Sequence, residues 1–111
     1  MYMISITLKE NHSTDTQDTK MFGQHKAWFQ KHFQLGNFLI MGPYLDAKHA
    51  GIIIARAKNR DVLDAIISED VYYPTGLADY QIREFSPILI AENISDTPLA
   101  VITGGNEADL K

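Results

Sequence analysis

The sequence contains no cysteine, and this absence excludes several kinds of chemistry. Without thiols the chain has no disulfide framework, no thiolate nucleophile and no zinc site with cysteine ligands. Such a chain suits a reducing compartment. The first residues begin a strand-like alternation at once, without the charged and apolar segments of an export signal. We therefore expect a cytoplasmic protein.

Clustered positive charge and long apolar runs are also lacking. The 10 lysines and arginines are scattered along a chain of formal net charge −4, whereas a nucleic-acid-binding surface needs a basic patch. No apolar run approaches the ~20 residues of a membrane span. We expect neither nucleic acid nor membrane as a partner. The 111 residues, 45% of them hydrophobic, suit one globular domain with a single core.

The motifs of several large enzyme classes are missing too. The sequence has no glycine-rich phosphate-binding loop, no GxSxG nucleophile elbow and no HExxH metal motif. His32 follows His25 by two helical turns, ~10 Å along the axis, which is too far for both to hold one metal ion directly. We expect His12 and His49 at the surface. We expect neither a metal site nor a cofactor.

The hydrophobic periodicity that is present predicts four strands and two helices. The predicted strands are Tyr2–Leu8, Phe38–Met41, His49–Ala57 and Leu77–Phe85. Between the first two strands, a polar loop over Asn11–Thr19 leads into a helix that runs to Leu35 and that Gly36 is placed to end. Asn59 is predicted to cap a second helix, whose buried stripe is Val62, Leu63, Ile66 and Ile67. The order βαββαβ is typical of the ferredoxin-like α+β fold, an antiparallel sheet with both helices on one face.

Residues 1–87 form this domain, and its sheet has a second face that needs a cover. Phe38–Met41 and Ile52–Ile54 are apolar on both faces, so a second copy of the sheet would bury them, and we predict a homodimer. Residues 88–111 form a C-terminal extension. Its apolar segments, Ile88–Ala91 and Leu99–Ile102, are predicted as short strands of an arm packed on the dimer. The polar end, Gly104–Lys111, is expected to be flexible.

One histidine stands out within the first helix. On a helical wheel His25 falls at the centre of the apolar arc, whose members are Met21, Phe22, Trp28, Phe29, His32, Phe33 and Leu35. A titratable ring in a buried stripe costs stability unless a partner hydrogen-bonds it. His25 is therefore either a core histidine capped by a backbone carbonyl or a general acid–base group. Asp70 is the carboxylate that this fold could bring close to it, although an acid at a helix end often binds only local backbone N–H groups.

Five further residues are candidates for binding a substrate. Gly42 and Pro43 could shape the rim of a pocket, but a strand-ending turn explains them equally well. Tyr72 and Tyr73 could line a pocket, or pack as aromatic plugs. Arg83 projects from the sheet face opposite Tyr80 and Ile82, where it is either an anion-binding group or a solvated arginine. Trp28 is most simply a core residue.

Four segments in this order are similar to the YciI-like (YCII-related) domain family over about Met1–Pro87. The segments are Gln24–Phe29, Gly36–Pro43, Glu69–Leu77 and Tyr80–Phe85. The resemblance implies a dimeric α+β barrel, in which two ferredoxin-like protomers pack sheet to sheet. It also implies that His25 and Asp70 are the family's proposed catalytic pair. The chain departs from the family at Val71, where a proline usually follows the aspartate.

These observations favour a small enzyme of the lyase or isomerase type that needs no cofactor. His25 would act as base and then acid on a small organic substrate, such as the hydroxylated aromatic compound from which one group of relatives removes chloride. The alternatives are a ligand-binding or regulatory homodimer that uses the same pocket, and a dimeric scaffold with a structural His25. A monooxygenase acting on quinols or haem is a further alternative, for which the sequence has no selecting motif. The expected partners are a second copy and a small molecule.

Overall fold

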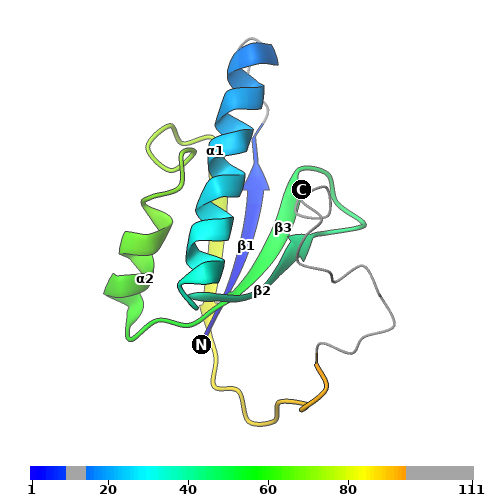
Figure 1. The fold of residues 1–111 in the computed structure, drawn as a ribbon, viewed down its shortest axis with the longest axis vertical. Helices are drawn as coiled ribbons and strands as arrows, with labels where there is room; N and C mark the ends of the chain where they lie inside the picture. Colours follow the sequence, from blue (N-terminus) through cyan, green and yellow to red (C-terminus); the bar gives the residue numbers. More distant parts are fainter. Residues whose placement is uncertain (10–14, 95–111) are drawn as a thin grey trace.

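The fold of the chain is seen in a computed structural model that describes residues 1–9 and 15–94 (Figure 1). The elements are β1 (Tyr2–Leu8), α1 (Asp15–Gln34), β2 (Phe38–Pro43), β3 (Ala50–Ala55), α2 (Arg60–Ile67) and β4 (Ala78–Glu84). This is the βαββαβ order that the sequence predicts. The expected α+β class with a ferredoxin-like arrangement is confirmed.

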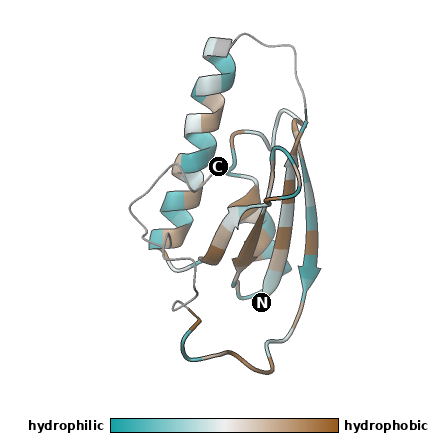
Figure 2. Cartoon of the chain, turned by 90° about the vertical axis from the view of Figure 1, so that its right-hand side faces the viewer, coloured by the Kyte–Doolittle hydropathy of each residue, from teal (hydrophilic) through white to brown (hydrophobic). Residues whose placement is uncertain are grey.

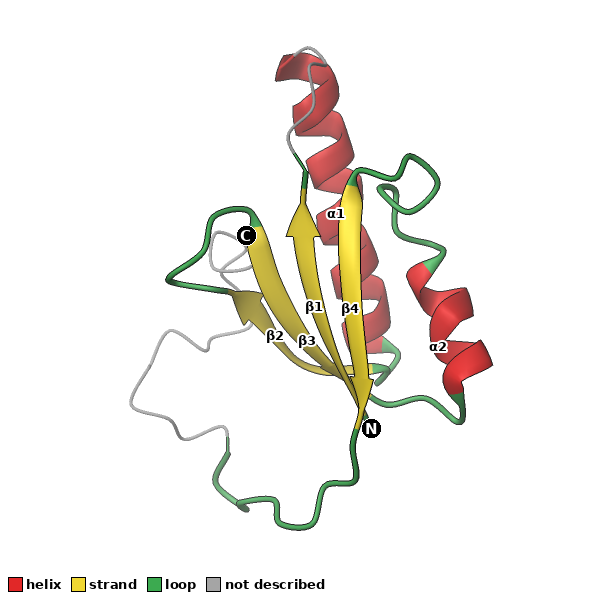
Figure 3. Ribbon diagram, turned by 180° about the vertical axis from the view of Figure 1, so that it is seen from behind, coloured by secondary structure: helices red, strands yellow, loops and turns green. Residues whose placement is uncertain are grey.

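The four strands form one antiparallel sheet in the order β2-β3-β1-β4. Ile4 of β1 lies opposite both Ile53 of β3 and Ile82 of β4, so these side chains share the face that the helices cover. Both helices lie on that face, α1 across the middle of the sheet and α2 beside β4 (Figure 1). Seen from behind, the other face carries no helix (Figure 3).

The core lies between the sheet and the two helices. Its buried hydrophobic residues are Tyr2, Ile4, Ile6, Met21, Trp28, Phe38, Ile53, Ala55, Leu63, Ile66, Ile67, Tyr72 and Ala78. Period-two alternation supplies those on the strands, and helical spacing supplies those on α1 and α2. Each buried aliphatic side chain of this kind contributes about 1.5–3 kcal/mol.

Helix α1 begins at Asp15, four residues before the predicted Thr19, so part of the predicted loop is helical. The polar first turn has no apolar periodicity from which the sequence could reveal it. At the other end Gly36 has φ 80°, and the Asn37 N–H donates to the His32 carbonyl at 2.9 Å. This left-handed cap ends the helix where the sequence predicts.

The buried stripe of α1 is narrower than predicted. Met21, His25, Trp28 and His32 face the core, whereas Phe33 is 54% exposed and Leu35 is 63% exposed. Successive helical residues are about 100° apart, so Phe33 points well away from a stripe that contains His32. On α2, Val62 is likewise exposed, although Leu63, Ile66 and Ile67 are buried as predicted.

After β4 the described chain leaves the sheet (Figure 1). The strand predicted over Ile88–Ala91 is not formed there, because no neighbouring strand offers it backbone partners. Its apolar residues are exposed, and the chain that carries them is brown below the sheet in Figure 2. The predicted strand Leu99–Ile102 and the tail Gly104–Lys111 lie outside the described residues. None of the helices in the described part is long and apolar enough to cross a membrane.

Candidate active site

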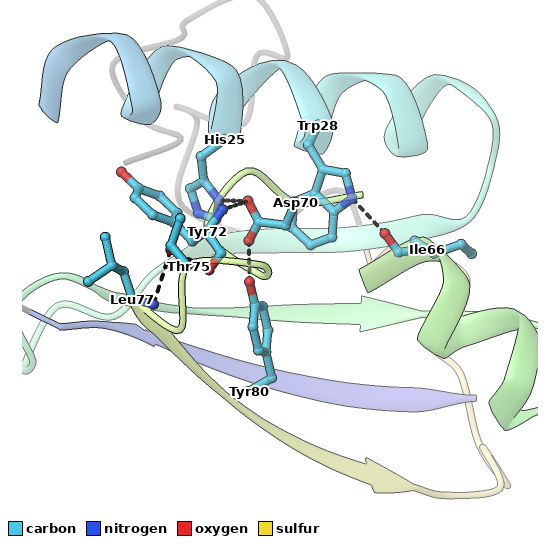
Figure 4. Close-up of polar contacts among 8 residues, drawn as sticks. All are labelled: His25, Trp28, Ile66, Asp70, Tyr72, Thr75, Leu77 and Tyr80. Carbon is cyan, nitrogen blue, oxygen red and sulfur yellow. Dashed lines mark hydrogen bonds and ion pairs between the residues drawn. The ribbon is translucent and has the colours of Figure 1, made fainter. Parts of the chain in front are cut away.

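His25 lies in the middle of α1 and faces the sheet, with only 3% of its surface exposed. Its Nδ1 atom lies 2.7 Å from Oδ1 of Asp70, a residue 45 positions further along the chain (Figure 4). The rings of Phe29 and Tyr72 pack edge-on against the imidazole at centroid distances of 4.4 and 5.0 Å. The structure therefore brings together the histidine and the carboxylate that the sequence singles out.

Asp70 is held in a turn just after α2. Its N–H donates to the Ile67 carbonyl at 3.0 Å, and its own carbonyl accepts from the Tyr73 N–H at 2.9 Å. The carboxylate reaches the local backbone only weakly, at 3.5 Å from the Tyr72 N–H. Its short contacts are instead with distant side chains, so a purely local role does not describe Asp70. Val71, which stands where relatives have proline, leaves this turn intact and packs half-buried against the core.

Tyr80 of β4 completes the arrangement, and sequence reasoning missed it. Its hydroxyl donates to Oδ2 of Asp70 at 2.7 Å (Figure 4). Burial raises the pKa of Tyr80 far above its ordinary value, and the hydrogen bond to Asp70 and the charge of Asp70 raise it further. The phenol therefore stays neutral and remains a donor. Strand alternation, which points Tyr80 toward the helices, was the available signal, because a buried phenol needs a partner.

These contacts assign the protons of the pair. An ionised carboxylate only accepts hydrogen bonds, so with Tyr80 donating to one oxygen, His25 donates its Nδ1–H to the other. The neutral imidazole then carries its lone pair on Nε2. Nε2 of His25 is the atom available to accept a proton from a ligand.

A cavity of about 720 Å³ adjoins the pair, within the range of small-molecule sites. His25 lines it together with three of the predicted binding residues, Gly42, Pro43 and Tyr72. At its wall β2 and β3 approach closely, since a Cβ atom on Gly51 would lie 2.8 Å from the Gly42 carbonyl oxygen. The cavity wall is otherwise largely apolar, and Phe22 and Phe29 of α1 contribute aromatic surface to it.

Two predicted binding residues are not brought to this cavity. Tyr73 is exposed and packs its ring 5.9 Å from that of Tyr80. Arg83 is exposed on the helix-free face of the sheet, in a shallow depression with Met3 and Phe85. Successive side chains on a strand point to opposite faces, so Arg83 faces outward because Ile82 faces the core. The structure thus places Arg83 on the sheet face opposite Tyr80 and Ile82, as predicted, and outside the cavity that His25 lines.

A second buried histidine, His32, has a different role. Its Nε2 lies 3.0 Å from Glu69 Oε1, and its Nδ1 lies 3.0 Å from Asn37 Nδ2, so both ring nitrogens have partners. A hydrogen bond from Lys31, at 2.6 Å, lowers the pKa of Glu69; burial opposes that shift and His32 adds to it. His32 is 2% exposed, contributes nothing to the cavity lining and is satisfied as a structural histidine.

The remaining candidates are Trp28, His49 and His12. Trp28 is a core residue as predicted, and its Nε1–H donates to the Ile66 carbonyl at 2.9 Å. His49 is exposed, as predicted, but it also lines the cavity. His12 lies outside the described residues. Within residues 1–9 and 15–94, no three His, Asp or Glu side chains gather as metal ligands would.

The sequence matches the YCII-related domain over residues 1–86. A crystal structure of muconolactone isomerase has a TM-score of 0.68 at 14% identity, over 81% of this chain and 94% of that chain. The 5-chloro-2-hydroxyhydroquinone dehydrochlorinase of Burkholderia phenoliruptrix AC1100, solved with 2,5-dihydroxybenzoquinone, has a TM-score of 0.55 at 15% identity, over 76% and 93%. These similarities show a shared fold. No curated protein matches the sequence.

Proposed function

Because this chain belongs to the YCII-related domain family, we propose that it is a small lyase- or isomerase-type enzyme whose His25–Asp70 pair moves protons on a small organic substrate. The observation that carries the proposal is the 2.7 Å contact between Nδ1 of His25, which lines a cavity of about 720 Å³, and Oδ1 of Asp70. A buried, oriented imidazole beside a ligand-sized cavity is the arrangement that general acid–base catalysis needs.

In this reaction Nε2 of His25 removes a proton from a substrate carbon. Asp70 stabilises the imidazolium that forms and keeps the ring in the required tautomer. Tyr80 holds the carboxylate by its second oxygen. An isomerisation ends when the imidazolium returns the proton to another atom of the substrate, so protons balance without any further reactant. In an elimination the electron pair of the broken C–H bond forms the new double bond, the leaving group departs with the electron pair of its own bond to carbon, and the imidazolium then releases the proton to water or to the leaving group.

The neighbours in fold support this class of reaction. One is named as an isomerase and the other as a dehydrochlorinase that was solved with a small quinone. Phe22, Phe29 and Tyr72 surround the cavity here with aromatic surface, which suits a flat ring. Gly42 and Pro43 would form the opposite rim. We therefore favour a small cyclic substrate, of which a hydroxylated aromatic compound is one example.

We further propose that the protein acts as a homodimer. The cytoplasmic location predicted from its sequence is part of the same proposal. On the helix-free face of the sheet, Ile54 lies opposite Ile40 of β2 and Met3 of β1. These three residues form an apolar row across adjacent strands, and Ile40 is 46% exposed. A second copy of the same face would remove the row from water.

The test is a substrate screen in D2O with small cyclic ketones, lactones and hydroxyquinones, read by NMR for deuterium uptake or rearrangement. The wild-type chain should exchange or convert a substrate, and His25→Gln should be ~10²–10⁴-fold slower, the usual contribution of a general base. The control is Lys58→Met, which alters an exposed residue that does not line the cavity. Circular dichroism must show that both variants fold.

The screen also separates this proposal from the ligand-binding alternative. A recognition module would bind a member of the panel saturably, without deuterium exchange and without conversion. That result, or exchange that persists undiminished in His25→Gln, would refute the catalytic proposal.

A further inference from the structure

The lysines around the cavity come from two neighbouring segments of the chain. Lys9 directly follows β1, and Lys48 and His49 lie in the loop between β2 and β3. The two segments are joined, because the Leu8 N–H donates to the His49 carbonyl at 2.8 Å. We call the three side chains Lys9, Lys48 and His49 the cationic lip. The lip borders the cavity that His25 lines.

Aromatic side chains also line the cavity. Phe22 and Phe29 come from α1, and Tyr72 comes from the turn after Asp70. Asp18 of α1 also borders the cavity, and it has interactions of its own within the structure. A ligand in the cavity thus meets the aromatic rings, the His25 imidazole, the Asp18 carboxylate and the cations of the lip.

The side chains of the lip are only lightly engaged. Lys9 Nζ lies 3.5 Å from Asp79 Oδ1, and both side chains are more than half exposed, so this ion pair is weak. Lys48 is exposed and forms no ion pair with a residue of the described part of the chain. The chain as a whole has a net charge of −4. Lys48, which has no ion pair in the described part, and Lys9, which is only weakly paired, therefore stand against the overall charge, and they favour an anion locally.

The backbone of His49 adds a second observation. Its φ of 55° lies in the left-handed region, which glycine occupies without steric cost and other residues adopt uncommonly. The hydrogen bond from Leu8 holds this conformation. The chain thus keeps an imidazole, at the edge of the cavity, in a position where glycine would fit more easily.

We propose that the cationic lip binds the carboxylate of a ring-shaped substrate, whose ring lies against Phe22 and Phe29 and whose reacting carbon meets Nε2 of His25. This inference rests on the proposed function, since it names the substrate class of the same site. The lip has no arginine and its cations are separate point charges, which suits a single carboxylate.

The test compares benzoate with benzamide, its neutral analogue, by ¹H–¹⁵N NMR titration of the full chain. Benzoate should shift the amide signals of Lys48 and His49, and benzamide should bind roughly three- to tenfold more weakly, the range expected for two half-exposed cations. The double variant Lys48→Met, His49→Asn should remove this preference. Asparagine suits the last position because it tolerates the left-handed conformation. Lys58→Met, an exposed lysine that does not line the cavity, is the matched control and should keep the preference.

Two results would refute the proposal that the cationic lip binds a carboxylate. One is equal binding of benzoate and benzamide, and the other is no binding of benzoate up to ~20 mM. The titration is repeated with His25→Gln, where the preference for benzoate should persist. If benzoate shows no preferential binding but His25-dependent exchange continues on uncharged substrates, the proposal about the lip is refuted and the proposed function is not. A preference for benzoate without any exchange refutes the catalytic proposal and keeps the lip.

Discussion

Replacing Tyr80 by phenylalanine removes one hydroxyl group and leaves the shape of the site almost unchanged. The lost hydrogen bond is the 2.7 Å contact with Oδ2 of Asp70, whose side chain is 0% exposed. After the substitution this oxygen loses a donor and gains no access to water. The carboxylate then depends on His25 for its one remaining short hydrogen bond in the described structure.

The size of the effect follows from the charge of the acceptor. A hydrogen bond to a charged group contributes about 1.5–3 kcal/mol to stability, roughly twice the contribution of a neutral one. Because the phenol itself is only part-buried, we expect a loss of about 2 kcal/mol in the free energy of unfolding. For a domain of this size that loss lowers the melting temperature by roughly 10 °C.

The assay is urea unfolding followed by circular dichroism, with Tyr73→Phe as the control. Tyr73 undergoes the same chemical change beside the same ring, but it is 49% exposed, and we expect a change below ~0.5 kcal/mol. A double-mutant cycle with Asp70→Leu then isolates the contact, because Tyr80→Phe should cost little once the carboxylate is gone. Equal losses for the two tyrosine variants, or full additivity in the cycle, would refute the reasoning.

Four further predictions concern other parts of the molecule. Because folding raises the pKa of Tyr80, its contribution to stability is intact below the pKa of an unfolded tyrosine, about 10, and is lost as pH rises beyond that value. Urea unfolding at several pH values should therefore show a smaller loss of stability with rising pH for Tyr80→Phe than for the wild type, and an equal loss would contradict this. Gly51→Ala places a Cβ 2.8 Å from the Gly42 carbonyl oxygen and should cost about 1–3 kcal/mol, measured by thermal unfolding, whereas a neutral result would mean that the strands separate freely. Ile54→Lys puts a charge in the apolar row of the sheet and should convert a homodimer into monomers in light scattering; an intact dimer would place the interface elsewhere. Asn59→Ala removes the cap on the Val62 N–H and should cost about 1 kcal/mol in urea unfolding, with Asn59→Ser as the variant that retains most of it.

The order of elements was predictable because each element has a strong local pattern. Tyr2, Ile4 and Ile6 alternate along β1 and are all buried, as alternation predicts. Asn59 is followed by an apolar stripe at helical spacing, and it caps α2 through the Val62 N–H. The first turn of α1 was missed because its residues are polar throughout. A local hydrophobic pattern gives no signal where a helix extends beyond the residues that pack against the sheet.

The candidate site was predictable only in part. His25 could be found because a titratable ring interrupts an apolar stripe. Asp70 was proposed because the predicted fold brings the end of the second helix near the first, and the family resemblance made that partner specific. The contact between them joins residues 45 positions apart, which no periodicity encodes. Tyr80 looked like any core tyrosine, since its partner depends on how the turn at Asp70 lies over β4. Arg83 could have been set aside by strand alternation alone.

The arrangement at the end of α2 explains how so small a domain holds Asp70 in place. Along one stripe of α1, three side chains hydrogen-bond to the same short segment: His25 to Asp70, Trp28 to the Ile66 carbonyl, and His32 to Glu69. The two histidines are seven residues apart, which is ~10 Å along a helix axis, whereas the two carboxylates belong to consecutive residues.

The His25 and His32 contacts start far apart on α1 and end at the adjacent residues Asp70 and Glu69. They therefore oppose sliding of the turn along α1. Tyr80 adds a contact from the sheet, so Asp70 is held from both layers. The structural pair His32–Glu69 thus serves the functional pair by fixing the turn that carries Asp70. A site held from both layers in this way does not depend on a proline after Asp70 to fix the turn, and Val71 can follow it.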